Sequence, residues 1–209
     1  TVSRAIRDHP DVSAETREMV LRVVAELGFY PSAAARGLVY GQTHEIGLVV
    51  ADISNPFYSL LARAVFDRAH ESGYAVMLGE TRDDPVRSKR YIGELLSRRV
   101  DGIIHVSSRL DEAVINPILE SGVPLVLANR RPNDGAGVDF VASDYVGSGR
   151  KATQHLLDRG HRSVLHLAGP GYASNSLALR QGYLEALADA GVPAREELIL
   201  HGSFQYEDG

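Results

Sequence analysis

The chain has 209 residues, of which 44% are hydrophobic and 23% are charged, and this composition suits one large α/β domain or a small domain followed by a larger one. It contains no cysteine, which excludes a disulfide framework and a thiolate metal site. The net charge of -5 gives no indication of nucleic-acid binding, so any such function must depend on local features.

The first 45 residues have the pattern of short helices. We predict one helix from Thr1 to about Arg7, and a second helix that begins after Ser13, whose side chain suits the N-cap position. Gly28 stands where a C-terminal cap belongs, at the end of this second helix. Apolar residues at helical spacing give the second helix one apolar face, made of Val20, Val23, Val24 and Leu27.

From Ile46 onward, apolar strand-like runs alternate with amphipathic helices. The predicted strands are 46–51, 74–80, 102–106, 125–128, 138–142, 163–168 and 198–201. The predicted helices are about 57–72, 86–98, 111–121, 146–159 and 177–190. This alternation predicts an α/β fold with parallel sheets covered by helices, in which ligands bind at the carboxyl ends of the strands.

Motifs of the common enzyme classes do not occur in the sequence. Gly147-Ser148-Gly149 is too short for a nucleophile elbow and opens a predicted helix. The chain has no three-glycine dinucleotide loop, no phosphate-loop lysine and no His-Glu-x-x-His pair. We therefore expect no catalytic residue, no metal and no cofactor. No run of about 18 apolar residues occurs and the first residues lack a signal-peptide pattern, so we expect no membrane association.

A series of short segments, ordered along nearly the whole chain, carries a family resemblance. The segments before residue 46 are Thr1-Val2-Ser3-Arg4-Ala5-Ile6, Asp11-Val12-Ser13-Ala14-Glu15-Thr16-Arg17 and Leu27-Gly28-Phe29-Tyr30-Pro31-Ser32-Ala33-Ala34-Ala35-Arg36-Gly37-Leu38. The later segments are Ile46-Gly47-Leu48-Val49-Val50, Ile53-Ser54-Asn55-Pro56-Phe57-Tyr58, Val100-Asp101-Gly102-Ile103-Ile104, Gly160-His161-Arg162 and Leu167-Ala168-Gly169-Pro170. Together they resemble the lactose-repressor (LacI/GalR) family of bacterial transcription regulators.

The resemblance implies three parts in a chain truncated at both ends. Residues 1–45 would form a partial helix-turn-helix headpiece with a hinge helix near 32–39. Residues 46–144 would form the first lobe of a two-lobed, periplasmic-binding-protein-like sensing domain. Residues 145–209 would form the start of the second lobe. The expected partners are double-stranded operator DNA, a sugar or nucleoside effector and a second copy of the chain, as a homodimer or tetramer. The expected location is the bacterial cytoplasm, associated with the nucleoid.

On the DNA side, the resemblance places the first predicted helix in the major groove and the hinge helix in the minor groove. A hinge helix of about two turns that contains Gly37 is marginal in water, so it can fold on DNA and melt when the domains move. Leu38 would be the apolar wedge between base pairs. The expected DNA-contacting residues are Thr1, Ser3, Arg4, Ser32, Ala35, Arg36 and Leu38.

On the sensing side, the candidate effector contacts lie at strand ends and helix starts. They are Phe57, Tyr58, Leu61, His105, Asn129, Arg130, Asn175 and Phe204. The chain departs from many relatives at one position, because Leu179 stands where they carry an effector-binding arginine and Arg180 follows one residue later. A shift by one residue turns a helical side chain by about 100°, so the resemblance leaves the effector open.

Two alternatives to this interpretation remain. A binding protein of the periplasmic type would not need the headpiece-like segment before Ile46. A regulator that has lost DNA binding would still contain that segment, although the segment would no longer bind DNA. Binding of the full-length protein to its own upstream region separates these alternatives from a working regulator.

Overall fold

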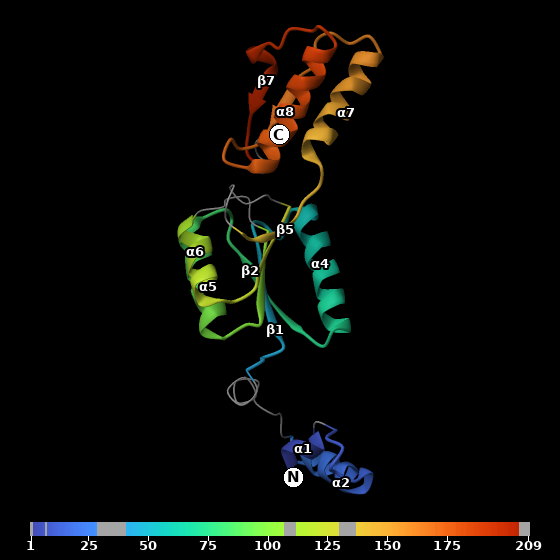
Figure 1. Cartoon of the computed structure of the whole chain (residues 1–209), viewed down its shortest axis with the longest axis vertical. Helices are drawn as coiled ribbons and strands as arrows, with labels where there is room; N and C mark the ends of the chain where they lie inside the picture. Colours follow the sequence, from blue (N-terminus) through green and yellow to red (C-terminus); the bar gives the residue numbers. More distant parts are fainter. Residues whose placement is uncertain (1, 7, 29–40, 107–111, 130–136, 205–209) are drawn as a thin grey trace. The chain divides into compact units, whose positions relative to one another are not determined.

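The computed structural model describes residues 2–6, 8–28, 41–106, 112–129 and 137–204 of the chain, and it divides into two compact units (Figure 1). The first unit comprises Thr1–Thr43 and the second His44–Gly209. Each unit has its own helices, and both sheets belong to the second unit.

The described residues of the first unit include two helices, α1 (Val2–Ile6) and α2 (Ala14–Glu26). The predicted cap of α2 is confirmed, because the Ser13 hydroxyl oxygen accepts a hydrogen bond from the Thr16 N–H at 3.3 Å. Gly28 has a φ of 58°, which is the left-handed conformation expected at a helix C-terminus. Ala5 of α1 is fully buried. The predicted apolar face of α2 lies open and lines a groove of 590 Å³.

The first sheet of the second unit is parallel and five-stranded, with the order β2-β1-β3-β4-β5. Its strands are β1 (Glu45–Val50), β2 (Ala75–Glu80), β3 (Gly102–His105), β4 (Leu125–Ala128) and β5 (Asp139–Val141). The helices between them are α4 (Pro56–Glu71), α5 (Pro85–Ser97) and α6 (Glu112–Ser121). Figure 1 shows α4 on one face of this sheet and α5 and α6 on the other.

Alternating strand side chains build a core on each face of this sheet. On the α5 and α6 side, Leu95, Ile103 and Ile118 are at most 2% exposed. On the α4 side, Leu48 and Val50 are fully buried with Val106. Because strands of a parallel sheet covered by helices are buried on both faces, they have near-continuous apolar runs such as Leu48–Val50.

Both α4 and α5 begin at a proline that follows an N-cap residue. The Asn55 side-chain oxygen accepts from the Phe57 N–H at 3.0 Å, and the Asp84 carboxylate accepts from the Val86 N–H at 2.8 Å. Pro56 and Pro85 then occupy the first helical position, where a missing N–H costs nothing.

The second sheet pairs β6 (His166–Ala168) with β7 (Ile199–His201) in parallel, alongside α7 (Tyr145–Asp158) and α8 (Ser174–Asp189). A short 3-10 helix, η1 (Glu196–Leu198), precedes β7. The predicted strand 163–168 is longer than β6, because β7 pairs with residues 166–168 alone. The hinge helix predicted near 32–39 lies outside the described residues. The other predicted elements and the α/β fold class are confirmed, with boundaries that differ by at most three residues.

Candidate functional site

Because the five strands of the first sheet are parallel, their carboxyl ends meet at one edge. Phe57, which follows the end of β1, is 44% exposed at the start of α4. Its ring packs edge-on against the ring of Tyr58, with centroids 5.1 Å apart. Tyr58 itself is only 5% exposed and belongs to the core beneath α4. Phe57 therefore presents the aromatic surface at this edge, and Tyr58 supports it from below.

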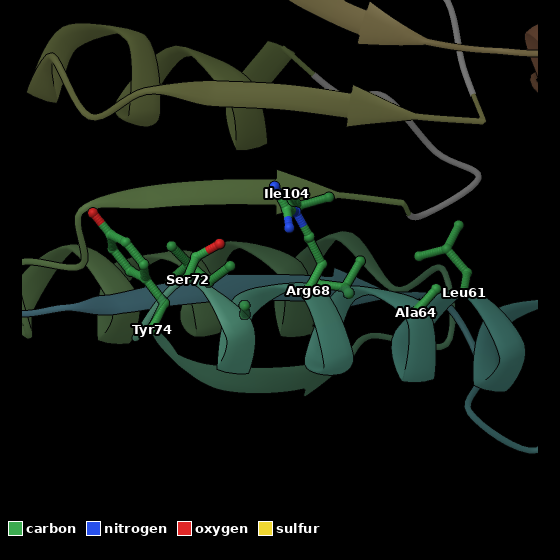
Figure 2. A pocket seen from close by; sticks show the side chains of 9 residues that line it. Leu61, Ala64, Arg68, Ser72, Tyr74 and Ile104 are labelled. Carbon is green, nitrogen blue, oxygen red and sulfur yellow. The ribbon is translucent and has the colours of Figure 1, made fainter.

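Three other predicted residues around the five-stranded sheet lie in three different environments. Leu61 lines an apolar groove of 410 Å³ between α4 and the sheet, together with Tyr74 and with Ile104 of β3 (Figure 2). His105 is fully buried at the end of β3. Asn129 is half-buried directly after β4, where its side-chain oxygen accepts a hydrogen bond from the Tyr145 hydroxyl. Of these three, Asn129 lies at the carboxyl edge with part of its surface accessible.

Two carboxylates that the sequence interpretation did not single out shape the loop after β1. The Asp52 carboxylate accepts from the Ser54 hydroxyl at 2.7 Å and from the Ser54 N–H at 2.9 Å. The hydrogen bond from the Ser54 side chain is the main reason why the pKa of Asp52 is lowered. Glu80, at the end of β2, accepts from the Ile53 N–H at 3.1 Å. Their position at strand ends was the signal available in the sequence.

Phe204 and Asn175 lie near the carboxyl edge of the two-stranded sheet. The Gly202 N–H donates to the Ala168 carbonyl at 2.9 Å, which continues the pairing of β6 and β7 past their ends. The Phe204 ring covers Gly169 so closely that a Cβ on this glycine would lie 2.5 Å from the ring. Asn175 is half-buried in the first turn of α8. One aromatic ring and one amide thus lie near the strand ends of the same two-stranded sheet.

Leu179 and Arg180 of α8 have different surroundings. The Leu179 carbonyl oxygen lies 2.3 Å from where a Cβ of Gly149 would stand, so this part of α8 presses its backbone against α7. Arg180 instead pairs with Glu196 at 3.6 Å, and its Nε atom is buried. Arg180 also lies close enough to His166 to act on its charge. Arg180 is therefore directed toward η1 and β6.

The ring of His166 stacks on the ring of Tyr183, with centroids 5.0 Å apart and planes at 16°. The Tyr183 hydroxyl donates to the Val164 carbonyl at 3.0 Å, so its ring is held in place. Burial of His166, followed by the positive charges of Arg180 and His201, lowers the pKa of His166 from its ordinary value of 6.5.

This shift predicts a pH-dependent stability. The unfolded chain binds a proton on His166 more tightly than the folded chain, so the free energy of unfolding falls as the pH drops below 6.5. We expect His166→Phe, which keeps a ring on Tyr183, to reduce the fall in melting temperature between about pH 7.5 and pH 5.5. The exposed His161→Gln is the matched control. An equal fall in wild type and His166→Phe would contradict the prediction.

In the first unit, Ser3 and Arg4 are exposed on α1. The Arg4 guanidinium lies 3.9 Å from the Asp11 carboxylate, and its side chain is 61% exposed, so this ion pair holds it weakly. The predicted contacts Thr1, Ser32, Ala35, Arg36, Leu38 and Arg130 lie outside the described residues. Within the part of the chain that the structure describes, no group of three metal-ligating side chains is found, and no helix is long and apolar enough to cross a membrane.

Two family models match the chain and together cover nearly all of it. The model described as "Periplasmic binding proteins and sugar binding domain of LacI family" matches residues 43–209. The model described as "Bacterial regulatory proteins, lacI family" matches residues 1–32. The boundary between the two matches lies close to the boundary between the two compact units.

Curated relatives match over the full length of this chain. Catabolite control protein A of Priestia megaterium is 33% identical, and the HTH-type transcriptional regulator CelR of Thermobifida fusca is 36% identical. The HTH-type transcriptional repressor PurR of Glaesserella parasuis is 32% identical. The chain spans 61–63% of the length of these three relatives.

Solved structures are similar in fold. A CelR–cellobiose complex is 33% identical with a TM-score of 0.71, over 100% of this chain and 63% of that one. The transcription regulator CcpA of Lactococcus lactis is 26% identical with a TM-score of 0.73, over 78% of this chain and 60% of that one. A lac repressor dimer bound to operator has a TM-score of 0.84 at 24% identity, over 99% of this chain and 62% of that one, and shows the fold alone.

Proposed function

The chain belongs to the LacI family of bacterial regulators, and from this membership we propose that it is part of a sequence-specific transcription regulator, acting as a repressor. A small-molecule effector bound between two lobes would control the affinity of the protein for operator DNA. The observation that carries this proposal is the presence, in one chain, of a helical headpiece unit and a periplasmic-binding-type unit. The family is one of transcription regulators, and we propose no catalytic role.

We propose that residues 1–45 contribute the headpiece and hinge, 46–144 the first lobe and 145–209 the start of the second lobe. The exposed side chains of Ser3 and Arg4 support a DNA-facing α1. For the hinge we retain Ser32, Ala35, Arg36 and Leu38 as proposed DNA contacts, with Thr1 beside them on the headpiece.

We propose a polar, ring-containing effector, of the sugar or nucleoside class. The exposed ring of Phe57 and the ring of Phe204 offer apolar faces for stacking. Asn129 and Asn175 offer amides for hydroxyl groups, and Arg130 remains a proposed contact. Tyr58, Leu61 and His105 would act from behind this surface, because all three are partly or fully buried. One of the similar solved structures is a complex of CelR with cellobiose, which makes cellobiose a suitable first probe.

We propose a homodimer or tetramer that works in the cytoplasm at the nucleoid. Operators with two half-sites mirror a two-fold symmetric protein, so a dimer follows from the proposed DNA function. Binding free energies of effector and operator would then be linked through the arrangement of the lobes.

The test is a gel-shift titration of the full-length protein with its own upstream region, with and without cellobiose. A specific shift supports a regulator, and its absence favours a binding protein or a regulator that has lost DNA binding. A thermal-shift screen of sugars and nucleosides identifies the effector class, because a bound ligand raises the melting temperature. Failure of every sugar and nucleoside in that screen would contradict the proposed effector class while leaving the DNA function standing.

A further inference from the structure

The chain passes from the first unit to the second at the bond between Thr43 and His44. His44 is exposed and has a φ of 55°, a left-handed conformation that is uncommon for residues with a side chain. The contacts that hold His44 therefore determine where the chain leaves the second unit.

Among the described residues, three contacts from segments distant in sequence hold His44. Its N–H donates to the Asp101 carboxylate at 2.9 Å, across 57 positions of the sequence. Its carbonyl accepts from the Ala75 N–H at 2.8 Å. Its ring packs against the ring of Tyr74, with centroids 5.3 Å apart. We call the group formed by His44, Tyr74 and Asp101 the junction clamp.

The junction clamp is built into the amino-terminal edge of the first sheet. Tyr74 directly precedes β2, His44 directly precedes β1 and Asp101 directly precedes β3. The Asp101 N–H donates to the Glu45 carbonyl at 2.8 Å, so Asp101 holds two successive residues, one through its backbone and one through its carboxylate. These three strands are neighbours in the order β2-β1-β3, and their pairing fixes the positions of the three clamp residues.

We propose that Asp101 is a positioning residue for DNA binding, which fixes the point at which the linker to the DNA-binding unit leaves the sensing unit. This inference rests on the proposed function. Asp101 acts through His44 and touches neither DNA nor effector, since it lies at the edge opposite to the candidate effector residues. Without its carboxylate, the start of the linker would sample more conformations, and operator binding would have to restrict them.

The test compares three variants of the full-length protein. Asp101→Ala removes the acceptor, Asp101→Asn keeps a side-chain oxygen at the same place, and Asp67→Ala changes an exposed carboxylate on α4 as the matched control. Fluorescence anisotropy with a DNA fragment of the protein's own upstream region measures affinity. Hydrogen exchange of a peptide spanning 41–46 measures protection of the His44 amide, and thermal unfolding measures stability.

We expect Asp101→Ala to weaken DNA binding about tenfold, the lower end of what a hydrogen bond to a charged group contributes. It should also speed exchange of the His44 amide, whereas Asp101→Asn and Asp67→Ala should stay close to wild type in both measurements. Equal affinities of Asp101→Ala and Asp67→Ala would overturn the proposal. If Asp101→Ala does not fold, hydrogen exchange of the wild-type protein still tests the proposal. Fast exchange of the His44 amide in wild type would show that this amide is not protected and would overturn the proposal.

The outcomes separate this inference from the proposed function. If the wild-type protein does not bind its upstream DNA at all, the proposed function fails. If it binds DNA but the clamp variants change neither exchange nor affinity, only the positioning role of Asp101 fails.

Discussion

Gly182→Ala is expected to destabilise the second unit by about 3 kcal/mol, the upper end of the usual cost of overpacking. A Cβ at this position of α8 would lie 2.0 Å from the Val146 carbonyl oxygen and 2.7 Å from the Arg150 nitrogen, both in the backbone of α7. A backbone cannot move aside as the end of a flexible side chain can. The two helices would have to separate, and their shared contacts would be lost.

Gly149→Ala should have a similar effect from the opposite helix, because its Cβ would lie 2.3 Å from the Leu179 carbonyl oxygen of α8. Calorimetry of the full-length protein measures both variants. A loss of about 3 kcal/mol corresponds to a fall of roughly 6 to 12 °C in the melting temperature of a unit of this size. The two effects should not add in a double variant, because one separation of the helices relieves both clashes.

Gly93→Ala on α5 is the matched control. An added Cβ there would have no neighbour within 4 Å, and the residue lies within a helix on an exposed face. Alanine is better than glycine in a helix interior by about 1 kcal/mol, so this variant should be slightly more stable than wild type. A melting temperature of Gly182→Ala equal to that of wild type would contradict the close backbone approach of α7 and α8.

Arg4→Ala in the full-length protein is expected to weaken operator binding by about 1–3 kcal/mol, which corresponds to a factor of about 5 to 150. The Arg4 side chain is 61% exposed on α1, and the Asp11 carboxylate that pairs with it is 3.9 Å away, so this weak ion pair leaves the guanidinium available for DNA. This prediction depends on the proposed DNA function. Anisotropy titrations with the upstream fragment and with a scrambled fragment measure it.

The matched control is Arg22→Ala on α2. The Arg22 side chain is 67% exposed and lies 3.6 Å from the Glu18 carboxylate, in a surface pair that contributes little to stability. Its loss should change operator affinity far less than the loss of Arg4. A salt series adds a second criterion, because loss of a phosphate contact lowers the salt slope by about 1 and weakens all sequences equally. Equal effects of the two variants would exclude a specific role for Arg4.

The sequence predicted the helices and strands well because their signals are local. The Ser13 cap and the Gly28 that ends α2 act within a few residues, and both hold in the structure. The strand predicted over 163–168 was too long for the opposite reason. The extent of this strand depends on its partner β7, which is more than 30 positions away in the sequence. Although apolar residues precede residue 166, β7 pairs only with residues 166–168.

The candidate effector surface was predicted in part. Phe57 and Asn129 follow strand ends and retain accessible surface, as their positions indicate. Tyr58 and His105 occupy equivalent positions in the sequence pattern but are buried. Whether a polar or aromatic residue at a strand end faces solvent depends on its side of the sheet and on the helix that covers it, and neither follows from the residue type.

The order of the elements, the α/β class and the family could be predicted from the amino-acid sequence, because periodicity, caps and short motifs are properties of neighbouring residues. Three contacts became visible only in the folded chain: Asp101 with His44, Gly182 with the backbone of α7, and His166 with Tyr183. Each of these contacts joins segments separated by many residues. Their geometry arises from the packing of strands and helices around a shared core, which no local pattern records.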